Sequence, residues 1–192
     1  EADEDLKRLA GVGDESLSDK VWETIRSRAP WLSVSCGAAL LSALVIAQFD
    51  AALEAIVALA ILMPVVSAMG GNAGTQTMTV AVRALATKDL TAANAWRIVR
   101  RELLTSLGTG AMFGAVLAAV SFAWFGDAGL SAVLGASLLF TFFMAAAAGV
   151  AAPLALERAG VDPAIASGPF VTTTIDVVGF FSFLGLATVA LL

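Results

Sequence analysis

The sequence predicts an all-α membrane protein with five transmembrane helices. Three observations indicate this fold class: 59% of the residues are hydrophobic, only 14% are charged, and the mean hydropathy is +0.88. A soluble domain carries about 25% charged residues, so a soluble fold is excluded. The 192 residues have room for one domain, and its long uncharged runs indicate lipid as the surrounding solvent.

Each long uncharged run is expected to be a membrane-spanning helix. A helix needs roughly 20 apolar residues to cross about 30 Å of hydrocarbon, and lipid offers no water to satisfy an irregular backbone. The last of these runs contains one acid, Asp176. In chain order the runs occupy residues 31–49, 55–82, 103–126, 128–156 and 163–192.

Charged residues mark the connections between the runs, and their distribution predicts the orientation. Asp50 and Glu54 separate the first two runs, and Asp127 separates the third from the fourth. All 11 lysines and arginines lie before the first run, in the second connection or in the fourth. By the positive-inside rule, the N-terminus is cytoplasmic and the C-terminus is extracytoplasmic.

Several classes of function are excluded or disfavoured by residue types. The net charge of −5 comes largely from the acidic stretch between Glu1 and Asp19, so no nucleic-acid partner is expected. Histidine is absent and Cys36 is the single cysteine, which leaves no disulfide framework and no cysteine-based metal cluster. No acid–base pair lies within a span, so the protein is not expected to be an enzyme.

Asp176 is the most informative single residue. Apolar stretches of similar length precede and follow it in the last run, and it is therefore predicted near the bilayer midplane. A carboxylate at that depth is costly, and no span contains a lysine or arginine to pair with it. We expect it to face a water-filled path. The alternative is a protonated aspartic acid that holds two helices together by a hydrogen bond.

The second run contains a polar, glycine-rich segment at residues 64–77. Gly70, Gly71 and Gly74 lie beside Asn72 and Gln76 in its middle, which is unusual for a lipid-facing helix. Glycine destabilises a helix, so the backbone is expected to unwind there and to direct carbonyls at a ligand. The alternative is close helix packing through the two glycines four residues apart, of the kind expected for Gly110-x-x-x-Gly114.

Carboxylate, amide and carbonyl oxygens at one depth suit a hard cation. Magnesium sheds its waters reluctantly, so a lone Asp176 fits a hydrated ion better than an all-protein cage. A two-fold dimer with the pore on its axis would supply a second carboxylate and balance the charge. Thr172, one turn before Asp176, is a candidate to hold a first-shell water. Gly168 and Pro169 are expected to shape the inner mouth, or Pro169 is only a kink with Thr173 and Thr174 bonded to the backbone around it.

The segment from Pro64 to Gln76, the sequence Val-Asp-Pro-Ala at 161–164 and the later Asp176 together resemble the MgtE family of bacterial magnesium channels. The resemblance covers nearly the whole chain. It implies a homodimer of five-helix subunits in the bacterial cytoplasmic membrane. It also implies cytoplasmic N and CBS domains before Glu1, with residues 1–28 forming a connecting plug-helix segment and residues 29–192 the pore domain.

The resemblance also implies roles for individual residues. Asp176 would hold hydrated Mg2+. Four further residues would lie beside it at the metal site, and five others would line the pore. Family members often have Asn in the place of Gly168 and Ala in the place of Thr172, so the inner mouth departs from the family pattern. The expected metal site comprises Asp176, Asn72, Gly70, Gly71 and Thr172, and the expected pore lining comprises Gly74, Thr75, Gln76, Gly168 and Pro169.

Two other functions remain open on the sequence. One is a secondary transporter that exchanges a divalent cation for Na+ or H+ at the same aspartate. The other is a non-conducting membrane scaffold in which the polar segment only packs helices. The residues do not discriminate Mg2+ from Mn2+, Co2+ or Ca2+.

Overall fold

The computed structural model describes residues 20–88 and 95–192. Every regular element in these two stretches is helical. A 3-10 turn and a short helix intervene between the first two long helices. In chain order the elements are α2 (Val21–Ile46), η1 (Ala47–Phe49), α3 (Asp50–Ala55), α4 (Val57–Ala86), α5 (Ala95–Phe125), α6 (Ala128–Arg158) and α7 (Pro163–Leu191).

Five helical segments of the described residues are long and apolar enough to cross a membrane, which confirms the predicted number. The helices α2 and α5 begin earlier than their apolar runs, at Val21 and Ala95 rather than at residues 31 and 103. A charged residue ends contact with hydrocarbon but does not end a helix, so both helices extend beyond their apolar runs. The 30 residues of α4 span about 45 Å, more than the ~30 Å of hydrocarbon.

The two tight turns of the bundle have specific causes. Gly160, with φ 73°, ends α6 in a Schellman motif: its N–H bonds the carbonyl of Glu157, and the N–H of Val161 bonds that of Leu156, both at 3.0 Å. Gly126, with φ 69°, ends α5. Asp127 then caps α6 by accepting a 3.0 Å hydrogen bond from the Leu130 N–H.

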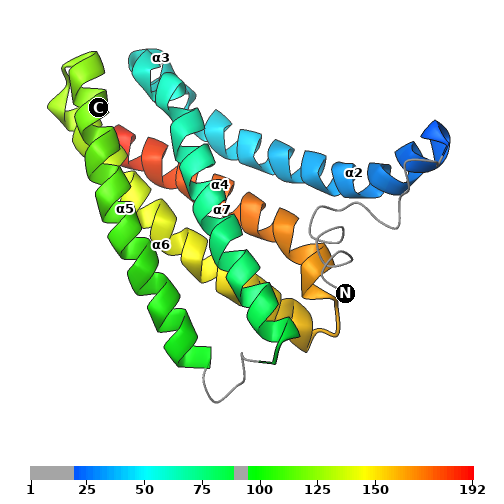
Figure 1. Cartoon of the computed structure of the whole chain (residues 1–192). Coiled ribbons are helices and arrows are strands. Elements are labelled where there is room, and N and C mark those ends of the chain that lie inside the picture. The colour runs from blue at the N-terminus through cyan, green and yellow to red at the C-terminus, as the bar shows by residue number, and fades with distance from the viewer. Residues whose placement is uncertain (1–19, 89–94) are drawn as a thin grey trace.

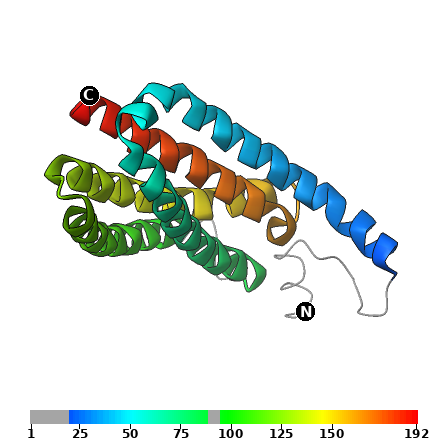
Figure 2. The same ribbon diagram turned by 90° about the horizontal axis from the view of Figure 1, so that it is seen from above.

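The long helices run back and forth between the two ends of the bundle. The end of α4, the start of α5 and the turn between α6 and α7 lie at one end, whereas α3, the α5–α6 turn and the C-terminus lie at the other (Figure 1). Viewed from above, α2 runs along α7 at the edge of the bundle (Figure 2). The helix α2 therefore has few neighbours besides α7, and its leucines are largely exposed.

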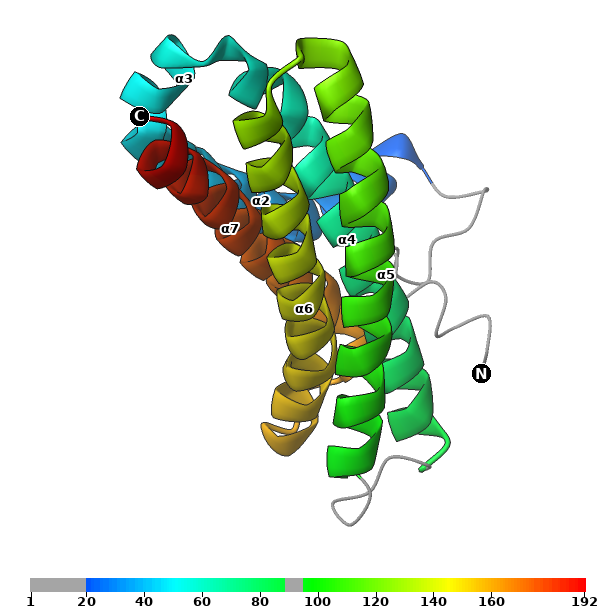
Figure 3. The same ribbon diagram turned by 90° about the vertical axis from the view of Figure 1, so that its left-hand side faces the viewer.

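The helix α6 forms the centre of the bundle and packs on α5, α7 and α4 (Figure 3). Its side chains Leu134, Leu138, Ala145 and Ala146 are at most 1% exposed. Gly149 brings α6 close to α4, because a Cβ there would lie 3.0 Å from the Gly74 carbonyl oxygen. This seam fixes the position of the polar segment of α4 relative to α6.

The helices α5 and α6 also meet through glycines. A Cβ on Gly110 would lie 2.9 Å from the Phe142 Cβ, and one on Gly114 would lie 2.9 Å from the Gly135 carbonyl oxygen. Only glycine permits such approach of one backbone to another. The packing role predicted for Gly110-x-x-x-Gly114 is therefore confirmed.

Candidate functional site

Asp176 lies in a groove between α2 and α7 with a volume of about 300 Å3. The carboxylate is half-buried and comes from the middle of α7. No lysine or arginine lines the groove in the part of the chain that the structure describes. The lining residues are Trp31, Ser35, Ala38, Ala39, Gly168, Pro169, Thr172, Thr173 and Asp176.

The polar partner of Asp176 is Ser67 on α4. The Ser67 hydroxyl donates a hydrogen bond of 2.7 Å to the Asp176 Oδ1. Both residues are half-buried, so the bond fixes one carboxylate oxygen while the side chain still borders the groove. A short bond to a carboxylate is among the stronger hydrogen bonds in proteins and orients the group it binds.

The three consecutive threonines of α7 differ in their hydrogen bonding. Thr173 donates to the carbonyl of Pro169 at 2.5 Å, and Thr174 donates to that of Phe170 at 2.8 Å. The predicted back-bonding of these two side chains is confirmed. Thr172 is exposed and makes no hydrogen bond within the described residues, so its hydroxyl is available to water one turn before Asp176.

The expected inner-mouth residues lie in the same groove. Gly168 and Pro169 both line it about two turns before Asp176. A Cβ on Gly168 would meet only the edge of Trp31, at 4.0 Å. Because α2 begins at Val21, Trp31 lies well inside that helix rather than at its end. The groove is therefore bounded by an indole ring at the place where Gly168 leaves space.

The expected unwinding of the segment 64–77 is wrong, because α4 is an unbroken α-helix from Val57 to Ala86. Gly70 and Gly74 instead allow close helix packing, which was the alternative interpretation of the segment. A Cβ on Gly70 would lie 2.6 Å from the Thr141 Cγ2, and one on Gly74 would collide with Ile175. Gly70 and Gly74 are buried at this contact and line neither groove. Gly71, in contrast, has no neighbour within 4 Å of a Cβ.

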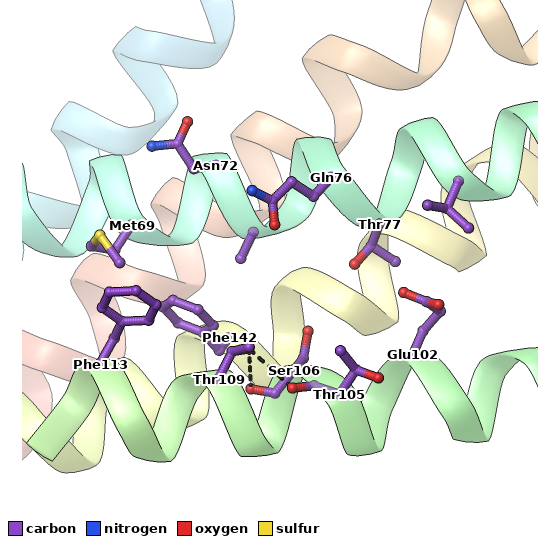
Figure 4. A pocket seen from close by; sticks show the side chains of 12 residues that line it. Met69, Asn72, Gln76, Thr77, Glu102, Thr105, Ser106, Thr109, Phe113 and Phe142 are labelled. Carbon is purple, nitrogen blue, oxygen red and sulfur yellow. Dashed lines mark hydrogen bonds between the residues drawn. The ribbon is translucent and has the colours of Figure 1, made fainter.

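Asn72 and Gln76 lie on another face of α4, along a second groove between α4 and α5 with a volume of about 490 Å3 (Figure 4). Asn72 follows Ser67 by five residues, which turns it by roughly 140° around the helix axis. Thr75 is exposed but lines neither groove. Within one chain, the structure thus separates the Asn72 amide from the Asp176 carboxylate, which the sequence had placed at one site.

Two features of these grooves were not found from the sequence. One is Ser67 in the glycine-rich segment, whose hydroxyl needs a partner at membrane depth. The other is the polar face of α5, formed by Glu102, Thr105, Ser106 and Thr109. Its spacing of three, four and seven residues is the pattern of one helix face and could have revealed it.

The chemistry of both grooves is that of oxygen donors. No group of three or more Asp, Glu, His or Cys side chains that could hold a metal ion occurs in the described part of the chain. One carboxylate with neutral oxygens suits a hard cation that keeps most of its water shell. A carboxylate in the middle of a membrane span that faces a groove marks a candidate site for the passage of a cation.

Comparison with known proteins identifies the family. Residues 63–186 match the family model described as MgtE, divalent cation transporter. This range contains Ser67, Asp176 and the polar face of α5. The chain belongs to the MgtE family.

Relatives with the same family name match along the whole chain. The magnesium transporter MgtE of Bacillus subtilis is 38% identical over 189 residues, which are 98% of this chain and 42% of the relative. That of Thermus thermophilus is 34% identical over an alignment of 200 positions, which covers 100% of this chain and 43% of the relative. The chain therefore spans less than half the length of these curated relatives.

Proposed function

We propose that the protein is the pore of a homodimeric Mg2+ channel in the bacterial cytoplasmic membrane, with its N-terminus inside and its C-terminus outside. The observation that carries the proposal is the position of Asp176, a carboxylate in mid-span that borders an open groove and is held by Ser67 rather than by a base. The names of the relatives, magnesium transporters, support Mg2+ as the ion.

In this proposal Asp176 binds the hydration shell of the ion and not the bare ion. A single carboxylate cannot replace the six waters of Mg2+, and removing them is costly. The free hydroxyl of Thr172, one turn away in the same groove, adds a second hydrogen-bonding group for that shell. A two-fold axis beside this groove would double both groups and balance the charge of the ion.

The other candidate residues take different parts in the proposal. The carbonyls of Gly70 and Gly71 lie within a continuous helix, so they are not proposed as ligands. Gly71 instead leaves open surface on α4, since nothing lies within 4 Å of a Cβ there. Asn72 and Gln76 line the α4–α5 groove and contribute to the polar surface away from Asp176.

Cytoplasmic regulatory domains are proposed to precede this chain in the full protein, since its relatives are more than twice as long as the matched part. The plug-helix segment expected at residues 1–28 lies mostly outside the described residues. Its last part, from Val21, is continuous with α2, which passes residue 28 without a break. A movement of those domains could therefore reach the groove at Trp31 through one helix.

Flux measurements in proteoliposomes test the proposal. Wild-type protein should pass Mg2+ along its own gradient without any Na+ or H+ gradient, and Asp176→Asn should reduce the flux to that of empty liposomes. Asp50→Asn, an exposed acid of α3, is the matched control and should leave the flux intact. The same vesicles give the ion selectivity when Mn2+, Co2+ and Ca2+ compete with Mg2+.

Each other outcome points to a different function. Flux that requires a Na+ or H+ gradient indicates a coupled transporter that uses the same aspartate. Flux that is unchanged by Asp176→Asn contradicts a pore at this residue. A folded dimer without flux under any gradient indicates a scaffold.

A further inference from the structure

Seven of the twelve side chains that line the groove between α4 and α5 are polar, although both of its walls are membrane-spanning helices. The α4 wall contributes Asn72, Gln76 and Thr77, and α5 contributes its polar face, defined above as Glu102, Thr105, Ser106 and Thr109. The apolar side chains Met69, Phe113 and Phe142 close the end nearest to the level of Ser67 (Figure 4). The groove therefore has a polar part and an apolar end.

Packing between α4 and α5 does not satisfy all of the polar groups of this groove. The helix α5 packs on α6 and barely touches α4, so the groove is open space and not an interdigitated contact. Thr109 bonds the carbonyls of Thr105 and Ser106, at 3.0 and 3.2 Å. Neither Glu102 nor Gln76 makes a hydrogen bond or ion pair within the described residues, and both border about 490 Å3 of space. Lipid cannot solvate such groups, whereas water can.

The charge of the groove is that of Glu102 alone. Its carboxylate points from α5 toward α4 in the neighbourhood of Thr77 (Figure 4). The neighbouring Arg97, Arg100 and Arg101 are exposed and do not line the groove. The side chain of Glu102 is half-buried, so its field is less screened by solvent than that of a surface acid.

We propose that the α4–α5 groove is filled with water and binds one hydrated divalent cation between the Glu102 carboxylate and the Gln76 amide. This site is separate from Asp176: Thr77, near Glu102, follows Ser67 by ten residues, or about 15 Å along α4. The inference rests on the proposed transport of divalent cations. It adds a site at the end of the bundle where α4 ends and α5 begins, which raises the local concentration of the ion before or after it passes Asp176.

The test introduces one cysteine at a time into a Cys36→Ser protein, which has no other cysteine. Each variant is reconstituted in proteoliposomes. Thr105→Cys lies in the groove, and its neighbour Leu104→Cys lies at the same depth on an outward face, where Leu104 is 57% exposed. A membrane-impermeant, cationic thiol reagent should modify Thr105→Cys and not Leu104→Cys. If Thr105→Cys does not fold, Thr109→Cys with Met112→Cys as its exposed partner provides the same comparison.

Protection by the ion then identifies the site. With Mg2+ at about ten times its dissociation constant, the modification of Thr105→Cys should slow by ~tenfold, because about a tenth of the sites remain free. Glu102→Gln should abolish this protection, whereas Asp176→Asn should preserve it. Flux of Asp176→Asn, measured in parallel, tests the pore by itself.

Three results would overturn the inference. An unreactive Thr105→Cys means that the groove is dry or is covered by a second copy of the chain. Reactivity that Mg2+ does not slow means that water enters but no cation binds. Protection that survives Glu102→Gln and disappears in Asp176→Asn assigns the ion to the other groove. In each case the flux data for Asp176 still stand, so failure of this inference is distinguishable from failure of the proposed function.

Discussion

The Ser67 hydroxyl of α4 and the Asp176 carboxylate of α7 are joined by a hydrogen bond of 2.7 Å in the middle of the bundle. The bond links two helices through residues that are 109 positions apart in the sequence. It also leaves one carboxylate oxygen free of any hydrogen bond within the described residues. The Asp176 side chain borders the groove, where its second oxygen is available to water or to a hydrated ion.

Ser67→Ala should impair ion passage without preventing folding. The substitution removes a hydrogen bond to an acidic group, worth about 1.5–3 kcal/mol if the acid is charged, and lets the carboxylate change its direction. The Mg2+ concentration for half-maximal flux in proteoliposomes should rise by roughly tenfold. Ser182→Ala is the control, because the Ser182 hydroxyl bonds only the carbonyl of Gly179 on its own helix. Equal effects of the two variants would contradict a specific role of Ser67.

Gly74→Ala should destabilise the bundle, whereas Gly71→Ala should not. A Cβ at Gly74 meets Ile175 and lies 3.0 Å from the Val171 Cγ1, and such overpacking costs about 1–3 kcal/mol. A Cβ at Gly71 meets nothing within 4 Å, and alanine in a helix gains roughly 0.5–1 kcal/mol over glycine. Thermal unfolding in detergent measures both. A lower midpoint for Gly71→Ala than for Gly74→Ala would show that the α4–α7 contact is not as described.

The α5–α6 seam should depend on Gly114 and not on Gly108. Gly114 faces the Gly135 carbonyl, and because backbone cannot move aside as a side chain does, alanine there should cost about 1–3 kcal/mol. Gly108→Ala, on the same helix and with nothing within 4 Å, is the matched control. We expect a lower thermal unfolding midpoint in detergent for Gly114→Ala than for Gly108→Ala. Equal midpoints would argue against this packing of α5 on α6.

Asp127→Ala should weaken the start of α6. The substitution removes the side-chain oxygen that accepts from the Leu130 N–H, and the loss of such a cap costs about 0.5–2 kcal/mol. Asp127→Asn keeps an acceptor and should retain most of the stability. Unfolding midpoints of the two variants separate the cap from the charge. If Asn is as damaging as Ala, the charge of Asp127 matters and not its hydrogen bond.

The number and approximate place of the membrane helices followed from the sequence, because crossing hydrocarbon imposes a minimum apolar length that can be counted along the chain. The start of α5 could not be predicted in this way. Residues 95–102 carry several charges and are still helical, since a helix continues for as long as its backbone bonds are made. The length of an apolar run therefore identifies the part of a helix that lies in lipid, but it does not show where the helix ends in water.

The polar segment of α4 shows where local reasoning fails. Glycines weaken an isolated helix, and on that basis a break at Gly70 and Gly71 was expected. In the bundle, Gly70 and Gly74 allow α7 and α6 to pack so closely that the helical form is stabilised by its neighbours. Tertiary packing therefore outweighs the intrinsic propensity of the segment.

The sequence by itself determined the membrane fold class, the acid at mid-span and the resemblance to a family of magnesium channels. Only the tertiary structure decided which polar groups share a groove. It paired Ser67 with Asp176, placed Asn72 at the edge of the α4–α5 groove and brought Glu102 beside α4. The physical reason is that depth in a membrane depends on position along one helix, whereas the side-chain partners depend on how each helix is rotated about its axis. That rotation is set by packing between segments far apart in the chain, which no local pattern contains.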